Sequence, residues 1–394
     1  MVRVPSNSCK RFLGEKDRVM LDKNIDLSNK RVIVTGAAGF IGSNLCMELI
    51  KRFEGIKILG LDNVNNYYDV GIKKDRLNTI AKLLGDAVGT AGEYGVSETI
   101  GDSKFVFIKG NIADRAVIDK VFDEFKPEVV VNLAAQAGVR YSIENPDAYI
   151  EANLIGFYNI LEACRHSYDA DKKTDGYNGV EHLVYASSSS VYGSNKKIPY
   201  STDDKVDNPV SLYAATKKSN ELLAHSYTKL YGIPSTGLRF FTVYGPAGRP
   251  DMAYFGFTNK LVKGETIKIF NFGNCKRDFT YVDDIVEGVI NVMEKAPDEN
   301  ENGVRYKVYN IGNNDPVNLL DFVDILQQEL ISAGVLPQDY DFEAHKELVP
   351  MQPGDVEVTY ADVTPLQQDF GFKPNTPLRE GLRRFAKWYK EYYG

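Results

Sequence analysis

The feature that most constrains the fold is a glycine-rich turn between an apolar strand and a helix. Residues 31–36 form a β-rich segment that ends in Gly36, and apolar residues recur at helical spacing over 45–53. Between these two segments, Gly36, Gly39 and Gly42 follow one another at intervals of three residues. In a strand–turn–helix unit such glycines permit a tight turn, bring backbone amides close to a pyrophosphate and let the helix pack on the sheet. The pattern predicts a dinucleotide site at the end of the first strand.

Strands and helices alternate from residue 31 to about residue 240. Further short apolar runs, typical of buried parallel strands, occupy 56–61, 105–108, 129–133 and 183–186. The alternation predicts an α/β fold, a Rossmann-type doubly wound parallel sheet. We expect the NAD-binding domain over 30–240, with later segments returning to it, and a smaller C-terminal substrate-binding lobe over 241–394.

Composition and charge exclude several function classes. The net charge is −7 without a basic block, which argues against nucleic acid as a partner. The longest charge-free apolar run, 129–139, is shorter than the ~18 residues that span a membrane. The four cysteines and four histidines are scattered, so we expect no metal site, no disulfides and a cytoplasmic location. Residues 1–29 are charged and lack an apolar core, which favours a loosely attached extension over a secretory signal.

Residues 187–217 carry the groups most suited to catalysis. The serine run that begins at Ser187 follows a buried strand, so its hydroxyls emerge at the carboxyl end, where ligands bind in open α/β sheets. Tyr213 and Lys217 are four residues apart and share one face of the expected helix. To act as a base near pH 7, a phenol must lower its pKa by ~3 units, or ~4 kcal/mol.

A lysine ammonium ~4–5 Å away contributes roughly 3–4 kcal/mol at an effective dielectric of about 20. Lys217 alone is therefore marginal, and the charge of an oxidised nicotinamide would complete the shift. Taken by itself, the YxxxK pattern occurs often by chance and more often marks a surface tyrosine and a solvated lysine. We expect Tyr213 and Lys217 to act beside a dinucleotide.

The identity of the dinucleotide is predicted from Asp62, at the end of the second strand. A carboxylate there accepts a hydrogen bond from the adenosine ribose 2′-hydroxyl and repels a 2′-phosphate, which favours NAD over NADP. Residues at the strand ends and on the helices beside them are expected to contact NAD: Gly36, Gly39, Phe40, Ile41, Gly42, Asp62, Asn63, Asn111, Ile112, Leu133, Ala134, Ala135, Gln136, Asn153, Tyr213, Lys217, Phe240 and Val243.

Several motifs together resemble one known family. The GxxGxxG spacing is similar to that of extended short-chain dehydrogenases/reductases. The other motifs of this resemblance are Ser188, Tyr213 and Lys217 and the segments 238–252, 277–284 and 351–356. From about Lys30 to the C-terminus, the chain resembles the UDP-glucuronate 4-epimerases of the NAD-dependent epimerase/dehydratase family. The resemblance implies a UDP-sugar substrate, C4 inversion through a 4-keto intermediate, and Ser188, Tyr213 and Lys217 as catalytic residues.

The resemblance also assigns substrate contacts. It places Thr242 and Arg249 at the sugar carboxylate, Arg277 at the diphosphate and Asp355 at the uridine ribose. Arg140 is expected to face either the substrate phosphates or solvent. The full set of expected substrate-binding residues is Arg140, Ser188, Ser189, Ser190, Tyr213, Thr242, Arg249, Arg277 and Asp355.

Two positions depart from the family. The superfamily usually has an aspartate at Asn111, whose side chain contacts the adenine amino group, so we expect weaker but retained adenine binding. The family usually has a tryptophan at Ala247, which leaves a 4-epimerase of UDP-glucose or a UDP-N-acetylhexosamine as an alternative. Ser189 and Ser190 stand where related 4,6-dehydratases and decarboxylases place carboxylates, so those activities rank lower, as does a non-catalytic nucleotide-sugar-binding protein.

Two of the expected helices are apolar over more of their circumference than one sheet face can cover. One runs from residue 145 to about residue 166, and the other contains Tyr213. Their apolar residues include Ile150, Leu154, Ile155, Phe157, Ile160, Leu212, Leu222, Leu223, Tyr227 and Leu230. In the superfamily these helices form the dimer, and we expect a homodimer through a four-helix seam.

Overall fold

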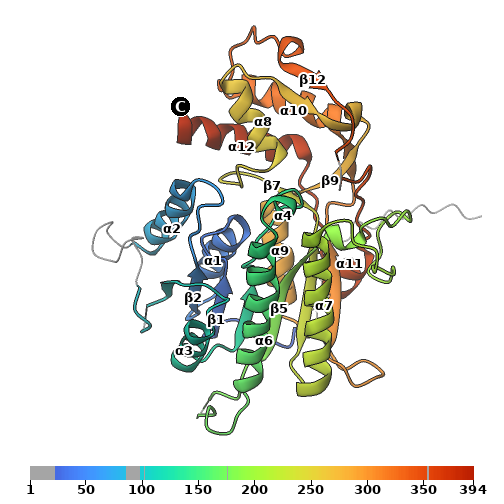
Figure 1. Cartoon of the computed structure of the whole chain (residues 1–394). Coiled ribbons are helices and arrows are strands. Elements are labelled where there is room, and N and C mark those ends of the chain that lie inside the picture. The colour runs from blue at the N-terminus through green and yellow to red at the C-terminus, as the bar shows by residue number, and fades with distance from the viewer. Residues whose placement is uncertain (1–22, 86–97, 102, 175, 353–354) are drawn as a thin grey trace, which may run out of the picture.

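The computed structural model describes residues 23–85, 98–101, 103–174, 176–352 and 355–394. Its centre is a parallel sheet with the strand order β3-β2-β1-β4-β5-β6-β10 (Figure 1). The strands are β1 (Arg31–Thr35), β2 (Lys57–Asp62), β3 (Phe105–Lys109), β4 (Val129–Asn132), β5 (His182–Ser188), β6 (Ser235–Phe240) and β10 (Tyr306–Ile311). The predicted doubly wound parallel sheet is confirmed.

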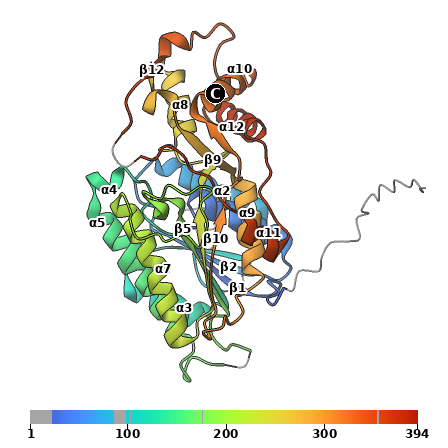
Figure 2. The ribbon, with the colours of Figure 1, turned by 90° about the vertical axis from the view of Figure 1, so that its right-hand side faces the viewer.

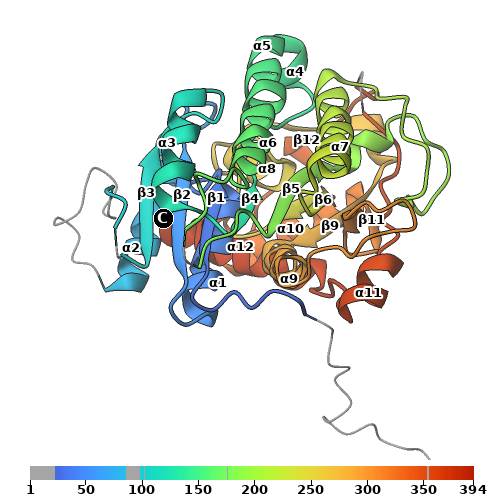
Figure 3. The same cartoon turned by 90° about the horizontal axis from the view of Figure 1, so that it is seen from below.

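Helices cover both faces of this sheet (Figure 3). One face carries α3 (Arg115–Phe125), α6 (Phe157–His166) and α7 (Leu212–Tyr231), and the other carries α1 (Phe40–Arg52), α9 (Val282–Met293) and α11 (Thr364–Phe370). Alternate strand residues enter the two cores, with Val32 and Val34 in one and Ile33 in the other. This period of two follows from the pleat and explains why the strands are apolar throughout.

A smaller lobe lies above the carboxyl ends of the strands (Figures 1 and 2). It contains one sheet of order β11-β9-β7, a two-stranded sheet of β8 and β12, and three helices. Its elements are β7 (Thr242–Tyr244), α8 (Ala253–Val262), β8 (Ile267–Ile269), β9 (Lys276–Tyr281), β11 (Pro316–Asn318), α10 (Leu319–Ser332), β12 (Lys346–Leu348) and α12 (Leu378–Tyr393). Because β10 belongs to the central sheet and α9 and α11 cover one of its faces, the chain crosses between the two parts several times after residue 241.

The helix expected from residue 145 has an interruption. It comprises α5 (Pro146–Tyr149), with proline in its first turn, then a π-helical stretch over Ile150–Gly156, and then α6. A short helix, α4 (Tyr141–Glu144), precedes it. π-helical turns often occur at functional sites.

The extension predicted for residues 1–29 lies largely outside the described residues. Of its described part, Leu27 and Ile25 are buried in the core, and Asn24 bonds to the backbone of Ala296. These last residues of the segment therefore pack on the end of α9 and are not loose. A further helix, α2 (Val70–Leu84), follows β2.

Candidate active site

The glycine turn forms a cradle at the N-terminus of α1. Gly36 has φ +71°, and a Cβ atom there would lie 2.9 Å from the Ala134 amide nitrogen. At Gly42 a Cβ atom would lie 2.2 Å from the Gly36 carbonyl oxygen. No side chain caps α1, whose N-cap residue is Gly39, so its first-turn amides are presented to the pocket. The turn therefore fits a dinucleotide pyrophosphate.

Asp62 ends β2 beside this turn and is buried, with 8% of its surface exposed. Its Oδ2 accepts a hydrogen bond from the Ala38 amide at 3.1 Å and its Oδ1 accepts one from the Val64 amide at 2.8 Å. A carboxylate accepts about four hydrogen bonds, so acceptor capacity remains for a ribose hydroxyl. The residues around the turn thus fit NAD.

One pocket gathers most of the expected cofactor residues with the catalytic residues. It is lined by Gly36, Gly39, Phe40, Ile41, Gly42, Asp62, Asn63, Asn111, Ile112, Leu133, Ala134, Ala135, Gln136, Ser188, Tyr213, Lys217, Phe240, Val243 and Arg249. Asn153 is buried behind this pocket: its Oδ1 accepts from the Gln136 amide and its Nδ2 donates to the Gln136 carbonyl. Asn153 thus holds the end of β4 in place and does not line the cavity.

Asn111 lines the pocket, but its side chain has protein partners. Its Nδ2 donates to Glu151 at 2.8 Å and its Oδ1 accepts from the Ala113 amide at 3.0 Å. The amide oxygen has a second lone pair. The weakened adenine contact therefore stays a prediction.

The catalytic residues come from the end of β5 and the start of α7. Ser188 is the N-cap of a 3₁₀ turn, and its hydroxyl accepts from the Ser190 amide at 3.1 Å. Ser211 caps α7, which places Tyr213 and Lys217 one turn apart at the pocket. The Ser188 hydroxyl donates to the Ser190 hydroxyl at 3.1 Å, and Ser188 and Tyr213 line the same pocket.

Desolvation dominates the electrostatics of Tyr213. Burial raises the pKa of Tyr213 above its ordinary value of 10.0, and the nearby Ser188 hydroxyl and the charge of Arg249 only partly oppose this effect. The Lys217 ammonium, expected to lower this pKa, instead donates to the Ala186 carbonyl at 2.9 Å. Burial lowers the pKa of Lys217 to about 8. The expected lowering of the Tyr213 pKa relied on the charge of an oxidised nicotinamide as well as on Lys217, and it stays a prediction.

A second pocket adjoins the first across the serine run. Its lining includes Ser189, Ser190, Thr242, Arg277 and Asp355. The Arg277 Nη2 donates to the Asp355 Oδ1 at 2.8 Å.

Arg140 approaches this second pocket from outside. Its Nη2 lies 3.9 Å from the Asp355 Oδ2, its guanidinium lies over the ring of Phe270, and its side chain is 61% exposed. The Arg140 side chain therefore lies beside the residues expected to bind the diphosphate and is also largely exposed to solvent.

Thr242 and Arg249, expected to act together, line different pockets. Arg249 lies in the first pocket with Tyr213, and its guanidinium forms a two-pronged ion pair with Asp251. Ala247, where the family usually has tryptophan, is not among the residues that line either pocket.

Four residues of this site were not predicted from the sequence. Asp251 pairs with Arg249 and accepts a hydrogen bond from Tyr67. Tyr149 packs its ring against that of Tyr213, with centroids 6.0 Å apart. The buried Arg76 donates hydrogen bonds to the backbone of the loop that carries Arg249. Asp251 stands inside the motif 238–252, which was the one available signal. The other three lie outside every motif.

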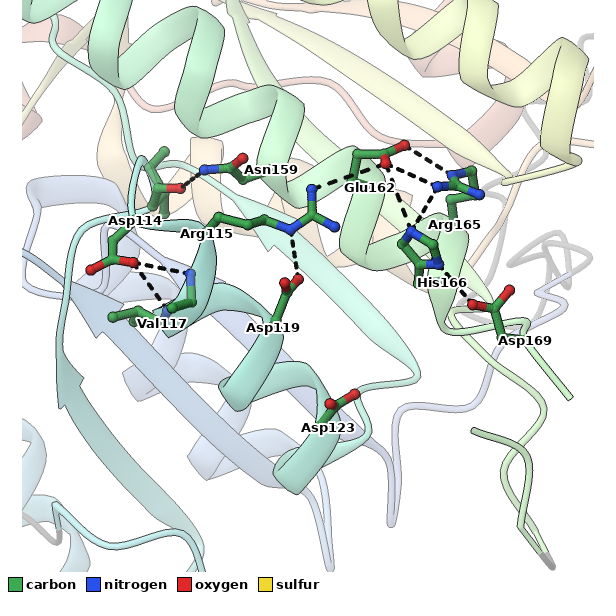
Figure 4. A network of polar contacts seen from close by, with 12 residues as sticks. Asp114, Arg115, Val117, Asp119, Asp123, Asn159, Glu162, Arg165, His166 and Asp169 are labelled. Carbon is green, nitrogen blue, oxygen red and sulfur yellow. Dashed lines mark hydrogen bonds and ion pairs between the residues drawn. The ribbon is translucent and has the colours of Figure 1, made fainter. Parts of the chain in front are cut away.

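Another polar cluster lies on α3 and the end of α6 (Figure 4). Its charged groups pair with one another: Arg165 with Glu162, His166 with Asp169, and Arg115 with Asp119. Arg165 lowers the pKa of Glu162 to about 2. The cluster is a network of surface ion pairs. Within the residues that the structure describes, no group of three or more His, Cys, Asp or Glu is placed to hold a metal ion, and no helix is long and apolar enough to cross a membrane.

Comparisons with known proteins agree with this geometry. The chain is 47% identical over 374 residues to Protein CapI of Staphylococcus aureus, covering 92% of this chain and 99% of that protein. It is 41% identical over 372 residues to UDP-glucuronate 4-epimerase 2 of Arabidopsis thaliana, covering 92% of this chain and 76% of the relative. The crystal structure of UDP-glucuronic acid 4-epimerase from Bacillus cereus with UDP-glucuronic acid and NAD superposes with a TM-score of 0.73 at 29% identity, covering 92% and 100% of the two chains. The model of the NAD dependent epimerase/dehydratase family matches residues 32–312, and the chain belongs to that family.

Proposed function

We propose that this chain is an NAD-dependent epimerase that inverts C4 of UDP-glucuronate to give UDP-galacturonate. The observation that carries the proposal is a single pocket in which the glycine turn meets Ser188, Tyr213, Lys217 and Arg249. The relatives named for UDP-glucuronate 4-epimerisation and the Bacillus cereus complex support the same substrate.

The residues divide the reaction between proton transfer and charge stabilisation. The glycine turn and Asp62 would hold NAD, which would supply a hydride acceptor beside the sugar C4. Tyr213 as phenolate takes the proton of the 4-hydroxyl, and Ser188 donates a hydrogen bond to the same oxygen as the ketone forms. The 4-keto sugar turns over in the pocket, and Tyr213 returns its proton to the oxygen at the other face.

Lys217 supplies the positive charge that the phenolate needs. With its pKa lowered to about 8 by burial, most of the ammonium stays protonated at neutral pH. Because burial raises the pKa of Tyr213, cationic neighbours are required to favour its anionic form. The buried pair therefore depends on charge compensation from within the pocket.

Arg249 distinguishes a uronate from a neutral sugar in this proposal. A carboxylate bound to its guanidinium gains charge-assisted hydrogen bonds that a 6-hydroxyl cannot match. The 4-keto uronate is also a β-keto acid that can lose CO₂, so holding its carboxylate near the ring plane keeps the breaking bond out of line with the carbonyl π system. Arg249 thus selects the substrate and protects the intermediate. Thr242, Arg277, Asp355 and Arg140 would bind the remainder of the nucleotide sugar.

The chain is also proposed to act as a cytoplasmic homodimer. Apolar side chains stay exposed on the outer faces of α5–α7 and the π-helical stretch, including Ile155 at 48%, Leu222 at 60% and Leu230 at 66%. Phe157 and Ile160 of the predicted set are instead buried in the chain's own core. The exposed residues lie on two adjacent helices, which suits a four-helix seam with a second copy.

The function is tested by incubation with UDP-glucuronate, UDP-galacturonate, UDP-glucose and UDP-GlcNAc in turn, following C4 by NMR. We expect the two uronates to interconvert and the neutral sugars to react slowly. Rapid turnover of UDP-glucose without turnover of UDP-glucuronate would support the alternative 4-epimerase of neutral sugars. Absence of turnover on all four by protein that carries NAD would overturn the proposal.

A further inference from the structure

The guanidinium of Arg249 is held on one edge by its own loop. Its Nε donates to the Asp251 Oδ1 at 3.0 Å and its Nη2 donates to the Asp251 Oδ2. A guanidinium has five N–H donors in a rigid planar fork. The pair uses the Nε/Nη2 edge, and Nη1 takes no part in it.

A tyrosine from the other part of the molecule holds Asp251 in turn. The Tyr67 hydroxyl, in the segment after β2, donates to the Asp251 Oδ2 at 3.1 Å. Burial alone would raise the pKa of Asp251, but the charge and hydrogen bonds of Arg249 outweigh it, and the pKa lies below its ordinary value. Asp251 is therefore a carboxylate with three hydrogen bonds from two side chains.

The backbone of the same loop is anchored as well. The Arg76 guanidinium donates to the carbonyls of Ala247 and Gly248, immediately before Arg249. Both the backbone and the side chain of Arg249 are thus positioned by protein contacts alone, and the guanidinium lies in the pocket with Ser188 and Tyr213.

We propose that Asp251 and Tyr67 are positioning residues that select which edge of the Arg249 guanidinium meets the substrate, and so give the site its preference for a hexuronate over a neutral hexose. The inference rests on the proposed function. With the Nε/Nη2 edge taken, the Nη1/Nη2 end is the two-pronged surface left for a second carboxylate. Pre-orienting it removes the cost of ordering a long side chain on binding.

The experiment compares equilibrium binding and turnover of UDP-glucuronate and UDP-glucose in the full-length protein loaded with NAD. The variants are Asp251→Asn, which keeps the shape but loses the charge, and Tyr67→Phe, which removes one hydrogen bond to Asp251. Asp119→Asn, in an exposed ion pair with Arg115 on α3, serves as the matched control.

Asp251→Asn is expected to weaken UDP-glucuronate binding and raise its KM by about tenfold, the equivalent of one charge-assisted hydrogen bond. UDP-glucose binding should change by less than about twofold in the same variant. Tyr67→Phe should shift the uronate in the same direction by about threefold, and Asp119→Asn should shift neither sugar.

Three results would overturn the inference. Tighter binding of UDP-glucuronate by Asp251→Asn would mean that Asp251 competes with the substrate for Arg249. Equal losses for both sugars would mean a general structural role, and equal affinity of the wild-type protein for both sugars would mean that Arg249 does not read the carboxylate. A further result would separate the two proposals. If the wild-type protein binds UDP-glucuronate preferentially but turns over neither sugar, and Asp251→Asn abolishes that preference, the proposed reaction is overturned and the positioning role is supported.

Discussion

Arg76 joins the cofactor turn to the substrate loop, and its removal is expected to damage both. Its side chain comes from α2 and is 2% exposed. All five N–H groups have acceptors: the Ala247 carbonyl twice, and the Gly248 carbonyl, the Ala38 carbonyl and the Tyr68 hydroxyl once each. Ala38 belongs to the glycine turn and Ala247 to the loop before Arg249.

Replacing Arg76 by methionine leaves three backbone carbonyls without this donor. An unsatisfied buried group costs about 1–3 kcal/mol. Because water can enter the space left by the guanidinium, we take the lower end, about 3 kcal/mol in total. The loop also has a left-handed residue, Ala247 with φ +50°, a conformation that costs of order 1–3 kcal/mol and persists only where its surroundings hold it.

We expect Arg76→Met to lose bound NAD and to bind UDP-glucuronate more weakly, because the turn and the loop both relax. Arg76→Lys keeps the charge but offers three donors in place of five, so it should be intermediate. Lys82→Met removes one exposed charge from the same helix and serves as the control. The assays are NAD content after purification, equilibrium binding of UDP-glucuronate and urea unfolding. Retention of NAD and uronate affinity at the Lys82→Met level in Arg76→Met would refute the reasoning.

The remaining predictions concern stability, pH and assembly. Glu221→Gln should destabilise the fold by about 3 kcal/mol or more in urea unfolding, because it leaves the Arg239 charge buried without a partner and both side chains are only 3% exposed. Arg239 also lowers the pKa of Glu221 in the folded protein, although burial acts in the opposite direction. The stability of the wild-type protein should therefore fall as the pH drops through this lowered pKa. Lys217→Met should abolish turnover yet be more stable at pH 7 by up to about 3 kcal/mol. This stability difference should shrink between pH 8 and 10.5, because in that range Lys217 is largely deprotonated in the folded wild-type protein but still protonated in the unfolded chain. A stability difference that stays constant over this range would contradict the lowered pKa. Leu222→Lys should give monomers in analytical ultracentrifugation, whereas Ile198→Lys, at a 50% exposed position away from the proposed seam, should not.

Much of the fold follows from local patterns. The strand–turn–helix around Gly36 and the pairing of Tyr213 with Lys217 each lie within one supersecondary unit, where strand ends and the helical repeat determine geometry over a short stretch of chain. The expected cofactor residues entered one pocket because parallel strands end at the same edge of a sheet. Asn153 is the exception, since its amide is taken up by the Gln136 backbone.

Contacts between distant segments were decided by the tertiary structure alone. Arg76 meets Ala247 across 171 residues of chain, and Tyr67 meets Asp251 across 184. No spacing rule encodes such pairs, because they depend on how a helix beside the sheet and a loop of the second lobe come together. The pKa of Tyr213 is set in the same way: the sequence determined which charges lie near the phenol, but only packing determined how far water is removed from it, and burial prevails.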